Sequence, residues 1–324
     1  MNHNNGLIFG YILDGKGGGT PIAWEKLGQW TPDQGTLWIH LDYSSETVKS
    51  WLYTESHLSQ ISCELLLEED TRPRIVTSED RLFLILRGVN CNPGSDPEDM
   101  VAVRMSFEEH RIISMRHRQV MAINDIHKAI EAGNGPTGSS NFLATITERI
   151  ADRMGDVVSE IDDRVDAVED SVITAESHEL RTILAVLRRQ CISLRRYIAP
   201  QRDVLTRLQS ERIDWLNEIS KLHLREIAER TARFVEDIDS ARDRAAITQE
   251  ELNNRLSEKM SKAMYVLSIV AAIFLPLGLL TGLLGINVGG IPGVESQLAF
   301  YNVSMVLLLL ALVLLWIFKR IKWL

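Results

Sequence analysis

The sequence predicts an α+β protein with two C-terminal transmembrane helices, in which a cytoplasmic α/β domain is followed by a helical hairpin and a very long stalk helix that continues into the membrane. The first observation behind this prediction is the charge distribution. The last 62 residues hold only four charged side chains, and residues 263–294 and 296–318 hold none. The second is a change of pattern near residue 140, where short β-type runs give way to long helical ones. This uneven pattern excludes a purely soluble chain, a disordered chain, and a nucleic-acid binder that depends on overall basicity.

Residues 1–140 form the predicted α/β domain. Strand-like runs alternate there with helical ones, and short polar turns after residues 77 and 107 indicate hairpins. The glycine-rich segment Gly15–Thr20 lacks the residue order of a phosphate-binding loop and predicts a hairpin turn instead. The expected strands cover residues 36–43, 74–77, 81–89, 100–107 and 111–115.

Residues 141–212 are expected to form a helical hairpin after a glycine-rich break. Residues 148–176 contain ten acidic residues and three arginines, whereas residues 177–210 contain seven arginines and two acidic residues. An acidic helix followed by a basic one favours antiparallel packing through complementary faces. The alternative is that the acidic residues between Glu160 and Asp170 bind a regulatory divalent cation, although they lack the spacing of a calcium-binding loop.

Residues 213–262 are predicted to form a stalk helix that continues into the membrane without a break. Apolar and small residues recur along it with alternating steps of four and three. This spacing is the heptad seam of a helix that packs against copies of itself or against neighbouring helices. The seam consists of Ile227, Thr231, Phe234, Ile238, Ala241, Ala245, Thr248 and Leu252.

Residues 263–284 and 299–318 are each long and apolar enough to cross a membrane. At about 1.5 Å per residue, each extends roughly 30 Å, which matches the hydrocarbon core. The loop between them, residues 285–298, has no lysine or arginine, whereas lysines precede the first span and the basic tail 319–324 follows the second. Because basic flanks stay in the cytoplasm, we expect a two-span protein of the cell inner membrane with both termini cytoplasmic. The outer loop is too short for a receptor domain.

Along one face of the first span, residues recur with the same alternating steps of four and three, and we call this set the stripe. Four of its members, Ser268, Ala271, Gly278 and Gly282, are small and faintly polar. Two interpretations of it are open. One is tight helix–helix packing, for which the two glycines four residues apart are a known motif, and the other is the lining of a pore. Two spans cannot enclose an aqueous path, so transport requires several copies of the chain. The stripe consists of Met264, Ser268, Ala271, Leu275, Gly278 and Gly282.

The tripeptide Gly285-Ile286-Asn287 ends the first span about a dozen residues before the second. With two C-terminal spans and the basic ending Lys319–Leu324, it resembles the signature of the CorA-type metal ion transporters, whose usual tripeptide is Gly-Met-Asn. Isoleucine in place of methionine, followed by the segment Val288–Gly293, resembles the ZntB zinc-transporter branch of that family. The resemblance covers the architecture of the whole chain, and its specific motifs lie in residues 285–293 and 319–324.

The resemblance implies a funnel-shaped homopentamer with five first spans around the pore and five second spans outside them. If the heptad seam and the stripe both face a central axis, the detergent-extracted particle should contain five chains. The resemblance places Asn287 in a ring that meets hydrated cations at the outer mouth. It places Met264, Ala271, Leu275, Gly278 and Gly282 along the conduit, with Leu275 and Met264 as apolar constrictions. Glu295 is the only acidic residue of the outer loop and either attracts cations or only keeps the loop soluble.

The resemblance therefore implies divalent metal transport, above all zinc uptake through a pentameric pore, with a magnesium, cobalt or nickel channel of the CorA type as the alternative. Residues 263–294 contain no histidine, cysteine or carboxylate, the ligands that bind zinc tightly, so we expect largely hydrated ions to pass. The same absence of titratable groups leaves proton coupling open. No catalytic constellation indicates an enzyme, and we expect no cofactor and no nucleic acid partner. A structural membrane anchor for the α/β domain is the remaining alternative.

Overall fold

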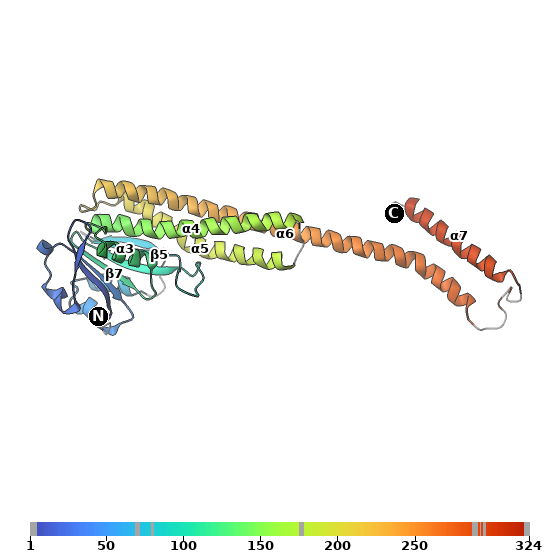
Figure 1. Cartoon of the computed structure of the whole chain (residues 1–324), viewed down its shortest axis with the longest axis horizontal. Coiled ribbons are helices and arrows are strands. Elements are labelled where there is room, and N and C mark those ends of the chain that lie inside the picture. Colours follow the sequence, from blue (N-terminus) through green and yellow to red (C-terminus); the bar gives the residue numbers. More distant parts are fainter. Residues whose placement is uncertain are drawn as a thin grey trace. The chain divides into compact units, whose positions relative to one another are not determined.

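The structure is a computed structural model that describes residues 5–68, 72–78, 81–174, 178–286, 291, 293 and 296–320. The chain divides into two units, residues 1–249 and residues 250–324. Figure 1 shows the order of the elements along the chain. Each unit is described separately below.

Seven strands form one mixed sheet at the centre of the N-terminal unit. The strand order is β2-β1-β3-β7-β6-β5-β4, and neighbours are antiparallel except β3 and β7, which are parallel. The five strands expected from the sequence are confirmed to within one residue at each end, and the glycine-rich segment is the turn between the first two strands. The strands are β1 (Leu7–Leu13), β2 (Gly19–Pro21), β3 (Thr36–Asp42), β4 (Arg74–Ser78), β5 (Arg81–Gly88), β6 (Val101–Phe107) and β7 (Arg111–Arg116).

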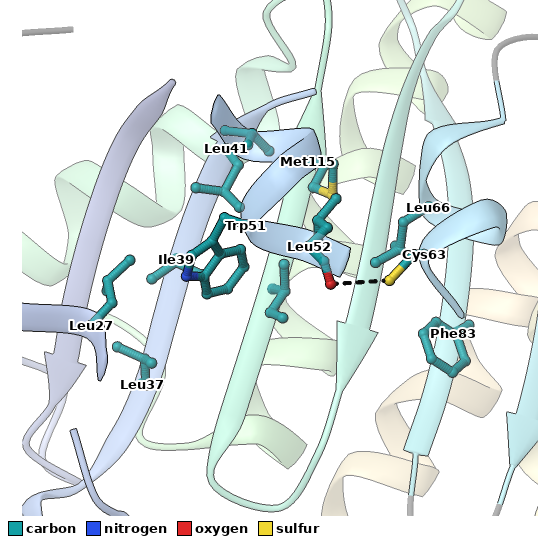
Figure 2. Packing of buried hydrophobic residues seen from close by; sticks show 12 residues of the cluster. Leu27, Leu37, Ile39, Leu41, Trp51, Leu52, Cys63, Leu66, Phe83 and Met115 are labelled. Carbon is teal, nitrogen blue, oxygen red and sulfur yellow. Dashed lines mark hydrogen bonds between the residues drawn. The ribbon is translucent and has the colours of Figure 1, made fainter. Parts of the chain in front are cut away.

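Helices cover both faces of the sheet, which explains why β3 is buried at every position except the last. On one face, β3 packs against Trp51 of α1 (Glu46–Thr54) and Cys63 of α2 (Gln60–Leu67), whose thiol donates to the Leu52 carbonyl oxygen at 3.2 Å (Figure 2). On the other face, Trp38 packs against Phe142 of α4 (Ser139–Thr174), with ring centroids 5.0 Å apart. Helix α3 (Met121–Glu131) lies next to α4, and two short 3-10 helices, η2 (Trp24–Gln29) and η3 (Pro32–Gln34), connect β2 to β3.

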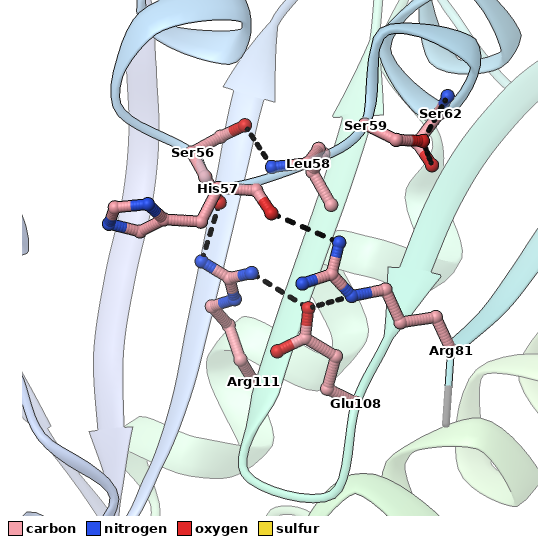
Figure 3. A network of polar contacts seen from close by, with 8 residues as sticks. All are labelled: Ser56, His57, Leu58, Ser59, Ser62, Arg81, Glu108 and Arg111. Atoms are coloured by element: carbon pink, nitrogen blue, oxygen red, sulfur yellow. Dashed lines mark hydrogen bonds and ion pairs between the residues drawn. The ribbon is translucent and has the colours of Figure 1, made fainter. Parts of the chain in front are cut away.

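Two arginines of the sheet hold the link between α1 and α2 (Figure 3). Arg111 of β7 donates to the Ser56 carbonyl oxygen at 2.8 Å, and Arg81 of β5 donates to the His57 carbonyl oxygen at 3.0 Å. Glu108 pairs with Arg111 at 2.7 Å and with Arg81 at 2.9 Å. His57 has a φ of 56°, a backbone conformation that residues other than glycine rarely adopt. The arginines therefore stabilise an unfavourable turn.

Three long helices follow the sheet: α4 (Ser139–Thr174), α5 (His178–Ser210) and α6 (Glu218–Leu284). The predicted very long helix is confirmed as α6, although it begins at Glu218 rather than at residue 213. The side chain of Asn217 accepts a hydrogen bond from the Ser220 N–H at 2.8 Å and so caps the first turn. Ile213 and Leu216 are buried in the turn before it.

The heptad seam of α6 packs inside its own chain. One buried cluster draws on all three long helices and consists of Ala151, Leu205, Ile227 and Ala228. Phe234 packs against this cluster. A Cβ added at Gly155 of α4 would lie 3.0 Å from the Phe234 ring, so α4 and α6 are in close contact there. Further seam residues of this unit are buried as well: Thr231, Ile238, Ala241, Ala245 and Thr248. Neighbouring helices of the same chain, one of the two kinds of partner that the spacing allowed, therefore cover the seam within the described part of this unit.

The charged faces of α4 and α5 pair with α6. The ion pairs that link α6 to these helices join Arg244 to Asp162, Asp166 and Glu169, Arg230 to Asp152, and Asp239 to Arg195. Among the described side chains, no ion pair joins α4 directly to α5. The expectation that the charges of α4 and α5 pair with each other is therefore wrong. Among the described residues they pair with α6, which lies beside both helices.

Candidate functional site: the apolar half of α6 and its end

Within the described residues, two helices are long and apolar enough to cross a membrane. They are α6, in its C-terminal part, and α7 (Ala299–Arg320), and the mean hydropathy of the most apolar stretch is 2.4 in each. None of the residues in these stretches is buried within the chain. A helix this apolar needs lipid or other protein around it.

Helix α7 lies against one face of α6 within the C-terminal unit. A cleft of about 180 Å³ marks the contact, and its lining is aliphatic except for one amide. The residues that line it are Leu280 and Leu284 of α6 and Asn302, Val303, Val306 and Leu307 of α7.

The stripe of α6 points away from α7. Leu280, which faces α7, stands two residues from both Gly278 and Gly282, and two residues along a helix correspond to a rotation of about 200°. A Cβ added at either glycine would meet no atom within 4 Å. Met264 and Leu275 are 62% and 72% exposed. The stripe is therefore a face that the chain itself leaves uncovered.

The polar groups of this segment are already bonded to their own helix. The Ser268 hydroxyl donates to the Met264 carbonyl oxygen at 2.9 Å, and the Thr281 hydroxyl donates to the Leu277 carbonyl oxygen at 3.0 Å. In the part of the chain that the structure describes, no group of three or more histidine, cysteine or carboxylate side chains could hold a metal ion. The described stripe therefore offers a smooth, weakly polar surface rather than a binding site for a bare ion.

Helix α6 ends at Leu284, at the beginning of the signature tripeptide. The Gly285 N–H donates to the Gly282 carbonyl oxygen at 3.2 Å, which closes the last turn, and Ile286 is 50% exposed. Asn287 and Glu295 lie outside the described residues, so the ring at the pore mouth and the outer acidic charge stay predictions.

At the other end of α7, Arg320 lies over the ring of Trp316 at 5.3 Å. An arginine and a tryptophan paired in this way are typical of the end of a span, where the charged group reaches water while the ring sits at the interface. The remainder of the basic tail, residues 321–324, falls outside the described part of the chain.

The acidic segment of α4, considered above as a cation sensor, is already paired with a cationic side chain of the same chain. Arg244 occupies the position between Asp162, Asp166 and Glu169, and the Thr248 hydroxyl donates to Glu169 at 3.3 Å. The acidic residues alone were visible in the sequence. That a guanidinium from a helix some eighty residues further along lies among them was not, because a charge pattern does not identify the neighbouring helix.

A buried histidine is a second feature that sequence reasoning missed. His40 is fully buried on β3, where its Nδ1 lies 2.9 Å from the Ser114 hydroxyl and its Nε2 has no partner among the described atoms. Burial, helped by the charge of Arg116, lowers the pKa of His40 to about 3. The imidazole is therefore neutral at physiological pH and belongs to the core of the sheet.

The chain is similar to known metal transporters over nearly its whole length. The family model of the CorA-like Mg2+ transporter protein matches residues 33–320. The divalent cation transporter CmaX of Pseudomonas aeruginosa is 38% identical over 327 residues, which cover 98% of this chain and 97% of that protein. The zinc transport protein ZntB of Yersinia enterocolitica is 36% identical over 317 residues, which cover 98% and 96%. The solved structure of full-length CmaX has a TM-score of 0.87 with this chain at 37% identity and covers 98% of both chains.

Proposed function

The chain belongs to the CorA-like Mg2+ transporter family, whose members carry divalent metal cations, and on that premise we propose that its principal cargo is zinc. Zinc transport protein ZntB is 36% identical to the chain over nearly its whole length. The tripeptide with isoleucine at position 286 points to the same branch. A magnesium, cobalt or nickel channel is the second candidate, supported by the breadth of the name that CmaX carries.

The observation that carries the transport proposal is the direction of the stripe on α6. Its residues face away from α7, and in the described chain all of them are exposed except Ala271, which is partly buried. Since two spans cannot enclose a water-filled path, we infer that five copies assemble with the stripes toward a shared axis and α7 outside. Gly278 and Gly282 then let the pore widen, whereas Leu275 and Met264 narrow it and close it when water leaves.

Ion passage in this pore follows from weak contacts. A ring of Asn287 amides at the mouth would accept hydrogen bonds from the water shell of the ion, and the stripe below it offers no charged ligand. A hydrated ion is then released as readily as it is taken up. The protein would lie in the inner membrane with both termini in the cytoplasm, because the outer loop has no basic residue and the flanks of both spans do.

Two neighbouring alanines provide a matched test of the stripe. Ala271 lies on the stripe and Ala272 lies about 100° away from it, so Ala271→Leu narrows the proposed pore whereas Ala272→Leu adds the same volume elsewhere. Zinc uptake by reconstituted vesicles should fall strongly for Ala271→Leu and stay near the wild-type rate for Ala272→Leu. Native mass spectrometry of both variants should show particles of five 36.7 kDa chains. Equal uptake by the two variants would mean that the stripe does not line the path.

A further inference from the structure

We propose that α4 and α5 each carry a charged strip, and that the α4 strip of one copy docks on the α5 strip of the next copy to form a closed ring. The inference rests on the proposed function, because it supposes several copies around one pore. The α4 strip consists of Arg149, Asp156, Asp163 and Asp170, and the α5 strip consists of Arg189, Arg196 and Asp203.

The α4 strip is an exposed row of charges on the outer side of its helix. Its members stand seven residues apart, which places them on one face. Buried residues of the same helix, among them Met154, Ile161 and Val168, occupy the opposite face. Within the described chain, none of the four strip residues forms an ion pair. Three carboxylates in a row without counter-charges repel one another, so a basic partner would stabilise this face.

The α5 strip has the same spacing and the opposite order of charges. Its members are also exposed and seven residues apart, and Ile192, 56% exposed, lies between the two arginines. Arg189 has no ion pair with any described residue. Arg196 lies 5.5 Å from the ring of Tyr197, and Asp203 pairs only with its neighbour Arg202 at 2.7 Å. The strip is therefore available to a charged partner.

The positions of the two strips along the hairpin match. Arg164 of α4 donates to Gln190 of α5 at 3.2 Å, and this bond fixes the register of the two antiparallel helices. Counting equal numbers of residues from it places Arg189, Arg196 and Asp203 opposite residues 165, 158 and 151 of α4. Each member of the α5 strip thus lies two positions, or about 3 Å, from an α4 strip residue of opposite charge.

Matching heights are what a ring requires. For a ring whose axis runs parallel to α4 and α5, rotation moves a copy sideways without raising it, so the α4 strip of one copy would meet the α5 strip of the next at equal height. Arg149 then faces Asp203, Asp156 faces Arg196, and Asp163 faces Arg189. If one strip were shifted by seven residues in either direction, one pair of like charges would face each other. The residue of opposite charge at one end of each strip therefore selects a single register.

Charge reversal in the full-length chain tests the docking. The variants are R189E/R196E, D156R/D163R and the combination of all four changes, and native mass spectrometry in detergent measures the ring population during dilution. Each double variant replaces two attractions by repulsions, and the concentration at which rings dissociate should rise about ten-fold or more. The combined variant restores opposite charges and should return it toward the wild-type value. Circular dichroism of each variant checks that the fold is retained.

The matched control is Arg233→Glu, which reverses an exposed charge on α6 outside both strips. It should leave the dissociation concentration unchanged. If neither double variant weakens the ring, or if the combined variant dissociates as readily as the doubles, the proposed docking is wrong. It is also wrong if only D156R/D163R acts and does so by removing a response to added magnesium, because the α4 strip would then bind cations instead. The proposed function is judged by the wild-type protein alone. It is retained if the wild type forms a ring and takes up zinc, even when the docking is wrong, and it is contradicted if the wild type is monomeric and takes up no zinc.

Discussion

Arg244→Gln removes the cationic side chain that, among the described residues, contacts the acidic side of α4 at Asp162, Asp166 and Glu169. The side chains of the arginine and its partners are between 32% and 56% exposed, so solvent screens each contact. At 0.2–1 kcal/mol for each exposed pair, three contacts sum to about 1–2 kcal/mol. For a unit of about 250 residues this corresponds to a melting temperature lower by roughly 2–4 °C.

The assay is thermal unfolding of the full-length protein in detergent, followed by tryptophan fluorescence. The matched control is Arg242→Gln, whose contacts, to Asp239 and Asp243, lie on α6 itself, so that no link between helices is lost. Because the three carboxylates are left without a counter-charge, millimolar magnesium should raise the melting temperature of Arg244→Gln more than that of the wild type. At about 1 M salt the difference between variant and wild type should shrink, since the Debye length falls to about 3 Å.

Two results would refute this reasoning. If Arg244→Gln melts at the same temperature as Arg242→Gln, the contacts between α4 and α6 do not stabilise the fold. If magnesium stabilises the wild type as much as Arg244→Gln, the arginine does not occupy the place of a cation, and the regulatory cation hypothesis for this segment regains its support.

Three further predictions concern the core and the pore mouth. The folded-state pKa of His40, about 3, lies below the unfolded value of 6.5. The contribution of neutral His40 to the free energy of unfolding is therefore fully present above pH 6.5 and falls by about 2 kcal/mol on going to pH 5. His40→Gln should flatten the pH dependence of the melting temperature, and an unchanged profile would contradict the assignment. Gly155→Val places a branched side chain against the Phe234 ring, 3.0 Å from the Cβ position, and should cost about 1–3 kcal/mol in urea unfolding, whereas wild-type stability would show that the helices separate freely. Asn287→Ala should lower zinc uptake by orders of magnitude, since five amides at about 0.5–1.5 kcal/mol each are lost, while Ile286→Met should retain uptake and accept more metals. Wild-type uptake by Asn287→Ala would remove that residue from the site.

The strands and the membrane spans could be predicted because local chemistry determines them. Short β-type runs bounded by polar turns gave five of the seven described strands, and uncharged stretches of about twenty residues gave the spans. The start of α6 was placed too early because Asn217, the capping residue, lies in a segment whose composition also suits a helix. The capping bond, rather than helix propensity, determines where the helix begins.

The partners of the charged and small residues could not be predicted, because they depend on which helices lie side by side. The seam on α6 had the correct spacing, yet only the structure shows that Ala151 of α4 and Leu205 of α5 cover it. The acidic row on α4 showed a need for cations but not that Arg244 supplies one. The stripe was identified from its residues, whereas its direction, away from α7, required the position of Leu280. The geometry of Asn287 lies outside the described residues.

The most direct test of the central claim is zinc entry into liposomes that contain the purified chain and a zinc-sensitive dye. If the chain transports zinc, the dye signal should rise well above that of protein-free liposomes when zinc is added outside, and Ala271→Leu should suppress the rise while Ala272→Leu does not. A wild-type signal equal to that of protein-free liposomes, with the protein present and correctly inserted, would contradict zinc transport by this chain.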